Sequence, residues 1–135
     1  MTERQPATVE PRINIAWALQ MKATTLEDPA RLSQTLTGAI LGNGGWVLSR
    51  GASDTGVIDI LFEFERQHCV DIYTVLIAAG LELSQLAHMR FTELCQCTSN
   101  HFRDCFGQIV SVDLEIHSFS LRFAPEGQGS SSEAA

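Results

Sequence analysis

The feature of this chain that most limits its fold is an alternation of apolar and polar residues in three separate segments. Residues 12–22, 57–65 and 109–121 place mainly apolar side chains on one side and small or polar ones on the other. A period of two residues is typical of a strand with one buried face. We therefore expect a sheet with one covered face and one open face.

Two helices are expected between the strands. Asp28-Pro29 predicts the start of the first, because aspartate accepts hydrogen bonds from the free amides of a first turn and proline suits that turn. Asn43-Gly44-Gly45 predicts its end. Residues 69–79 form a second apolar helical face, which ends at Gly80.

The segment 86–97 is compatible with either an amphipathic helix or a strand. Its residues Ala87, Met89 and Phe91 alternate with polar neighbours, and two helices in series would leave one sheet edge unpaired, so we favour a strand. With a short strand at 46–49, the order becomes β-α-β-β-α-β-β. This predicts an α+β, ferredoxin-like two-layer sandwich with both helices on one face and an additional C-terminal antiparallel strand.

The composition indicates one domain and excludes several partners. The chain has 135 residues, enough for a single core, which we place at 12–123 between flexible tails at 1–11 and 124–135. A formal charge of −7 with scattered arginines argues against nucleic acid. No apolar run is long enough for a membrane span, and no secretory signal precedes the domain, so we expect a cytoplasmic protein with reduced thiols.

The residues from Leu26 to Ser33, Leu-Glu-Asp-Pro-Ala-Arg-Leu-Ser, are followed by a helix, Asn43-Gly44-Gly45 and a strand hairpin. This order resembles the ACT family of small-molecule-sensing regulatory domains over residues 12–97. The resemblance implies that the loop after the first strand meets an amino acid or similar effector at a dimer interface. The implied ligand-binding residues are Asp28, Pro29 and Ala30, with Asn43 and Gly44 from a neighbouring protomer. Ala30 stands where the family has a glycine, and the same residues also fit a plain helix cap and helix stop.

A second group of residues could carry metal or thiol chemistry. Cys95, Cys97, His101 and Cys105 bring four soft ligands into one short segment, and zinc prefers four such ligands. Cys-x-Cys is an uncommon chelate, and free cysteines are more often small buried hydrophobic residues. Zinc binding or thiol chemistry is therefore an alternative function. Cys69, which follows His68, is expected in the core.

The open face of the sheet offers the remaining candidates. Acidic and basic side chains are expected there at Asp59, Glu63, Glu65, His88, Arg90, Asp113, Glu115 and His117. Paired carboxylates can act as acid and base, so a small enzyme is another alternative, although exposed acids are usually solvated. Apolar residues are expected on the same face at Ala16, Ala18, Val57, Leu61, Leu94, Phe119 and Leu121. A mixed face favours contact with a second copy.

The leading hypothesis is a non-catalytic regulatory or ligand-sensing domain that forms a homodimer through this open face. It assigns no catalytic residue, no metal and no cofactor, and its ligand would be a small metabolite. The sequence lacks the common signatures of hydrolases, nucleotide-binding proteins and metalloproteases.

Overall fold

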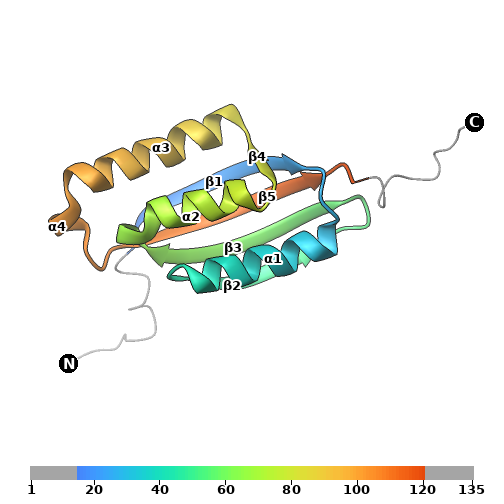
Figure 1. Ribbon diagram of the computed structural model, residues 1–135, viewed down its shortest axis with the longest axis horizontal. Helices are drawn as coiled ribbons and strands as arrows, with labels where there is room; N and C mark the ends of the chain where they lie inside the picture. The colour runs from blue at the N-terminus through green and yellow to red at the C-terminus, as the bar shows by residue number, and fades with distance from the viewer. Residues whose placement is uncertain (1–14, 121–135) are drawn as a thin grey trace, which may run out of the picture.

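The protein is an α+β domain with a five-stranded mixed sheet, and the computed structural model describes residues 15–120 (Figure 1). Three longer helices lie together on one side of the sheet. The elements are β1 Ile15–Thr25, α1 Pro29–Gly42, β2 Gly45–Ala52, β3 Val57–Glu65, the 3₁₀ turn η2 Arg66–His68, α2 Cys69–Ala78, β4 Leu81–Leu83, α3 Gln85–Asn100, α4 Phe102–Cys105 and β5 Ile109–Ser118.

The sheet has the strand order β2-β3-β5-β1-β4. The last strand, β5, lies between β1 and β3; it runs parallel to β1 and antiparallel to β3. Leu114 of β5 is opposite Met21 on one side and Ile60 on the other. Because β5 lies in the centre of the sheet under the helices, its inward residues are fully enclosed, and Val110, Val112, Leu114 and Ile116 have no exposed surface.

The helical layer covers one face of the sheet with three adjacent helices. Each helix directs its buried positions at the strands, for example Leu36 of α1, Ile72 of α2 and Phe91 of α3. The ring of Phe91 stacks on Phe64 of β3, with centroids 6.1 Å apart. The ring of Tyr73 in α2 lies at 5.4 Å from the Phe91 ring. These aromatic contacts place α3 beside α2, on the same face of the sheet.

The expectation that residues 86–97 form a strand is wrong, because this segment lies within helix α3. The buried residues Ala87, Phe91, Leu94 and Thr98 recur at intervals of four, three and four, which is the spacing of one helical face. Ser84 caps the helix by accepting a hydrogen bond from the amide of Ala87 at 3.1 Å. The alternation seen in the sequence covers only the first turns of this helix.

The ferredoxin-like arrangement is not confirmed, because the strand order differs from that of an ideal ferredoxin-like sheet. The sheet edge that seemed to need residues 86–97 is occupied by the three-residue strand β4, which pairs with the end of β1. The C-terminal strand β5 is antiparallel to β3, as expected, but it is parallel to β1 and lies in the centre of the sheet. The expected helix at 29–42, the hairpin and the strand at 57–65 are present.

The second face of the sheet carries none of the three packed helices. Ala18, Gln20, Lys22, Asp59 and Asp113 are exposed on it. The predicted tails, and the predicted domain ends at 12 and 123, lie outside the described residues.

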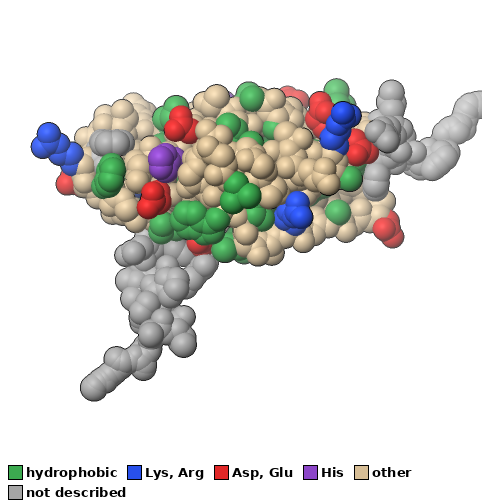
Figure 2. Space-filling view, turned by 60° about the horizontal axis from the view of Figure 1, so that its bottom comes forward, with side chains coloured by type: hydrophobic (Ala, Val, Ile, Leu, Met, Phe, Trp, Pro, Cys, Tyr) green, Lys and Arg blue, Asp and Glu red, His purple; other side chains and the backbone are tan. Residues whose placement is uncertain are grey.

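The described residues 15–120 can be checked for a membrane span, and the face in Figure 2 for clustered basic side chains. None of the helices in residues 15–120 combines the length and apolar character that crossing a membrane requires. Figure 2 views the molecule from the side of α1 and β2, where Lys and Arg side chains stand apart from one another. This agrees with the scattered arginines of the sequence.

The packing of α3 can be tested by removing one ring. Phe91→Ala leaves a cavity between Phe64 and Tyr73, and we expect the free energy of unfolding to fall by about 3–5 kcal/mol. Met89 on the same helix is 57% exposed, so Met89→Ala should change it by less than about 0.5 kcal/mol. Urea unfolding measures both variants, and equal effects would show that α3 is not packed as described.

Candidate functional site

The residues predicted to hold a ligand lie at opposite ends of helix α1. Asp28 caps the N-terminus by accepting from the amide of Arg31 at 3.2 Å, Pro29 is buried in the first turn, and Ala30 is exposed. Asn43 and Gly44 follow the other end, about 20 Å away along the helix. The cap and the stop are confirmed. The ligand role, which needs a neighbouring protomer, stays a prediction.

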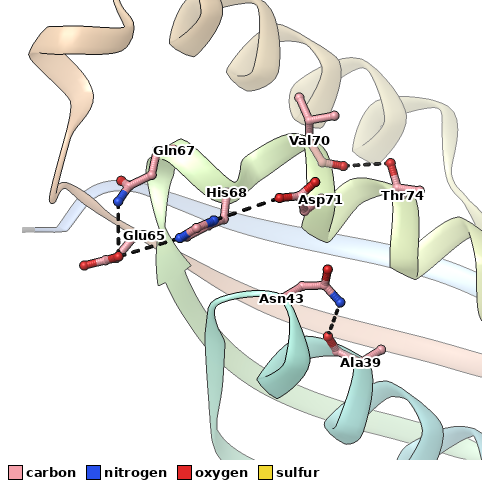
Figure 3. A network of polar contacts seen from close by, with 8 residues as sticks. All are labelled: Ala39, Asn43, Glu65, Gln67, His68, Val70, Asp71 and Thr74. Carbon is pink, nitrogen blue, oxygen red and sulfur yellow. Dashed lines mark hydrogen bonds and ion pairs between the residues drawn. The ribbon is translucent and has the colours of Figure 1, made fainter.

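Asn43 and Gly44 each have a local structural role at the end of α1, where Figure 3 shows the side chain of Asn43. The side-chain amide of Asn43 donates a hydrogen bond to the carbonyl of Ala39 at 2.8 Å and so caps the C-terminus of the helix. Gly44 has a φ of 91°, and a Cβ there would lie 2.6 Å from the ring of His68. That ring lies between Glu65 and Asp71, at 3.8 and 3.9 Å. Glycine is required by this backbone conformation and close approach.

The four candidate soft ligands do not gather. Cys95 and Cys97 lie two residues apart on helix α3, so they point in different directions, and Cys105 is buried in α4. His101 is exposed between the two helices. Within residues 15–120, no group of three or more His, Cys, Asp and Glu side chains could hold a metal ion. The alternative of a zinc site assumed a turn between two strands, whereas the segment is helical and keeps the four side chains apart.

Glu115, one of the acids expected on the open face, does not have the raised pKa of a general acid. Glu115 and His117 are neighbours on one face of β5, with Oε2 and Nε2 2.6 Å apart. This hydrogen bond, together with the charge of Lys22, lowers the pKa of Glu115. A general acid needs a raised pKa. Glu63 is buried, accepts from the indole of Trp46 at 3.1 Å, and lies about 13 Å along the sheet from Glu115.

Several residues expected on the open face lie elsewhere. Leu94 is fully buried in the helical layer, and His88 contacts the hydroxyl of Tyr73 at 2.8 Å on the α2 side of α3. Val57 and Leu61 are half-buried on the open face, and Phe119 beyond β5 is 64% exposed. Leu121 lies outside the described residues, and the structure does not describe the side chain of Ala16.

A groove runs along the open face between β1, β5 and the first turns of α3. One hollow of about 520 Å³ is lined by Gln20 of β1, Asp113 of β5 and Arg90 of α3. A second hollow of about 400 Å³ shares Gln20 and Asp113 and continues toward Lys22 and Glu115. The groove exists because β4 is short. It pairs only with Ala23–Thr25 at the end of β1, and the part of β1 before Ala23 is bordered by helix α3 instead of a strand.

Two charged side chains of the first hollow have no partner in the described part of the chain. The side chains of Arg90 and Asp113 form no hydrogen bond or ion pair with any residue in 15–120, although both line the same hollow and carry opposite charges. By comparison, the loop at Asp28 adjoins a hollow of about 240 Å³ that is lined by Glu27 and Arg31 but by none of the three predicted residues. Unpaired opposite charges on one concavity are the arrangement that binds a charged ligand.

A polar cluster inside the helical layer was not expected from the sequence. Arg66, at the end of β3, is only 6% exposed. Its guanidinium donates to Thr98 Oγ1 at 2.9 Å, to Gln108 Oε1 at 2.8 Å and to Cys97 Sγ at 3.1 Å, and it lies over the ring of Trp17. Burying a guanidinium is tolerated only with such partners. The contacts join residues far apart in sequence, so no local pattern could reveal them.

Comparison of the chain with family models, with curated proteins and with solved structures gives no match. The resemblance to the ACT family therefore stays a prediction.

The structural role of Gly44 can be separated from a ligand role. Gly44→Ala places a Cβ against the ring of His68 in a left-handed backbone, so the free energy of unfolding should fall by at least about 1–2 kcal/mol. Gly38 in α1 has open space around it, and Gly38→Ala should raise stability by about 0.5–1 kcal/mol. Thermal unfolding compares the two variants. Unchanged stability in Gly44→Ala would contradict the described turn.

Proposed function

We propose that this protein is a non-catalytic regulatory domain that binds a small zwitterionic metabolite in the groove between β1, β5 and α3. The observation that carries the proposal is the pair Arg90 and Asp113, which line one hollow from opposite walls without pairing to each other. A ligand with one negative and one positive group satisfies both side chains at once. Charge-assisted hydrogen bonds of this kind are among the strongest in proteins.

The chemistry of the walls favours an α-amino acid with an apolar side chain. The guanidinium of Arg90 suits a carboxylate in a two-pronged contact, and the carboxylate of Asp113 suits an ammonium group. The amide of Gln20 lies in the same hollow and can either donate or accept. Leu86, 60% exposed, and Ala18 supply an apolar surface for the side chain.

This proposal keeps the predicted class of function but moves the site away from the loop at Asp28. Asp28 is engaged in capping α1, whereas the groups of the groove remain available. A cytoplasmic location belongs to the same proposal, and four cysteines without disulfides are consistent with it.

A homodimer through the open face is a second proposal. The exposed ring of Phe119 and the half-buried Val57 and Leu61 favour it, because these residues give the face apolar surface beside its acids. Sedimentation equilibrium over a range of concentrations tests the dimer. A monomer at every concentration would exclude the dimer, and the groove site would remain.

The ligand proposal predicts saturable binding of at least one free amino acid. Amide chemical shifts of the labelled protein, titrated with each amino acid in turn, should move at Gln20, Arg90 and Asp113. Arg90→Gln and Asp113→Asn should each weaken binding about tenfold or more, because each removes a charge-assisted hydrogen bond. Asp59→Asn on the same face and Arg103→Gln on α4 are the matched controls and should bind like the wild type.

Two results would overturn the proposed function. One is the absence of saturable binding with every amino acid tested. The other is binding that shifts the amides of residues 28–30 and 43–44 and leaves the groove unchanged, which would return the site to the loop implied by the ACT resemblance.

A further inference from the structure

Strand β2 forms a free edge of the sheet. It is the outermost strand in the order β2-β3-β5-β1-β4, and within residues 15–120 its eight residues pair only with β3. At the other margin β4 has three residues, and helix α3 borders the rest of β1. In the described part of the chain, the outer N–H and C=O groups of β2 are therefore the one long row with which another strand can pair.

Helix α1 extends this edge into a surface that is two layers thick. The helix packs against β2 (Figure 1), and Arg50 of the strand donates to Thr37 Oγ1 of the helix at 3.1 Å. Leu41 lies one helical turn beyond Thr37 on the same side of α1 and is 57% exposed, and Leu48 of β2 is 43% exposed. We call β2, together with Thr37 and Leu41, the β2 margin. It combines an unpaired backbone with exposed apolar side chains.

The two elements of the β2 margin lack acidic residues, although the chain as a whole is acidic. Neither α1 nor β2 contains an aspartate or a glutamate, and their only charged residues are Arg31 and Arg50. The whole chain has 16 Asp and Glu residues and a formal charge of −7, so two copies tend to repel each other. Repulsion between carboxylates is weakest at this margin, and the core of an interface is typically depleted of charge. The charge distribution therefore favours a second copy of this chain at the β2 margin.

We propose that two copies of this chain pair through their β2 margins, with the two β2 strands antiparallel about a two-fold axis. This pairing joins the two five-stranded sheets into one and brings the α1 helices of the two copies toward each other. It ends at two copies, because each sheet has only one long free edge among its described strands. The groove lies beside β1, on the other side of the sheet from β2. Each copy therefore keeps its groove open, and this proposal is independent of the ligand site.

The size of the β2 margin is sufficient for a weak dimer. The eight residues of β2 make an edge about 27 Å long, and the sheet and helix layers together are about 20 Å thick. These dimensions correspond to about 1,100 Å² of surface buried on both copies together, near the lower limit for specific interfaces. The bulge between Val47 and Ser49 twists the strand and shortens its regular run. We therefore expect a dissociation constant between about 1 μM and 1 mM.

Lysine substitutions test which surface forms the dimer. Leu48→Lys and Leu41→Lys each place like charges on both copies at the β2 margin, and we expect each to weaken dimerisation at least about tenfold in sedimentation equilibrium. Val70→Lys on α2 changes a side chain with the same 57% exposure as Leu41 but outside the margin, and this variant should dimerise like the wild type. Phe119→Lys on the open face should also leave the dimer unchanged. Circular dichroism checks that each variant is folded.

The decisive measurement uses the wild-type chain and requires no variant to fold. In a mixture of isotope-labelled and unlabelled protein, nuclear Overhauser contacts between copies should connect β2 of one copy with β2 of the other. A monomer at every concentration up to about 1 mM would overturn the proposal. A dimer that Phe119→Lys weakens and Leu48→Lys does not would also overturn it, and would assign the contact to the open face.

Discussion

The fold depends on the insertion of β5 between β1 and β3. This strand supplies a hydrogen-bonded neighbour to both halves of the sheet and brings four fully buried apolar residues, from Val110 to Ile116, under the helices. Without it, β1 with β4 and β2 with β3 would be two separate pairs with exposed edges. The last described strand therefore completes the core, because β5 pairs with β1 and β3, which are distant from it in sequence.

The placement of β5 also determines where chemistry can occur. Because β5 is central, its outward residue Asp113 lies beside Gln20 of β1, within reach of the groove. Because β4 is short, α3 takes the position beside β1 and brings Arg90 to the rim. The other side of α3 faces α2, where the ring of Phe91 contacts that of Tyr73. One helix thus contributes both to the groove and to the core.

The local features of the fold could be read from the sequence, and the long-range ones could not. Alternation identified the strand at 57–65, and the Asp28-Pro29 cap identified α1, because both patterns are local. Alternation failed at 86–97, where the first turns of an amphipathic helix happen to alternate, and β4 was missed because three residues are too few to show a period. Strand order was wrong because it depends on β1 and β5 meeting across most of the chain.

For the candidate sites too, local features could be predicted from the sequence and long-range contacts could not. Arg90 and Asp113 were expected on the open face, but Arg90 reaches it from a helix and not from a strand. The partners of Arg66 in α3 depend on how this helix packs against the turn after β3, which no spacing encodes.

The central claim is that β5 separates β1 from β3, and nuclear Overhauser contacts between backbone protons test it most directly. The structure predicts parallel contacts between β1 and β5, with Met21 beside Leu114, antiparallel contacts between β5 and β3, with Leu114 beside Ile60, and no direct pairing of β1 with β3. Direct contacts between β1 and β3, with β5 at an edge, would restore the ferredoxin-like sheet and contradict the arrangement on which the groove depends.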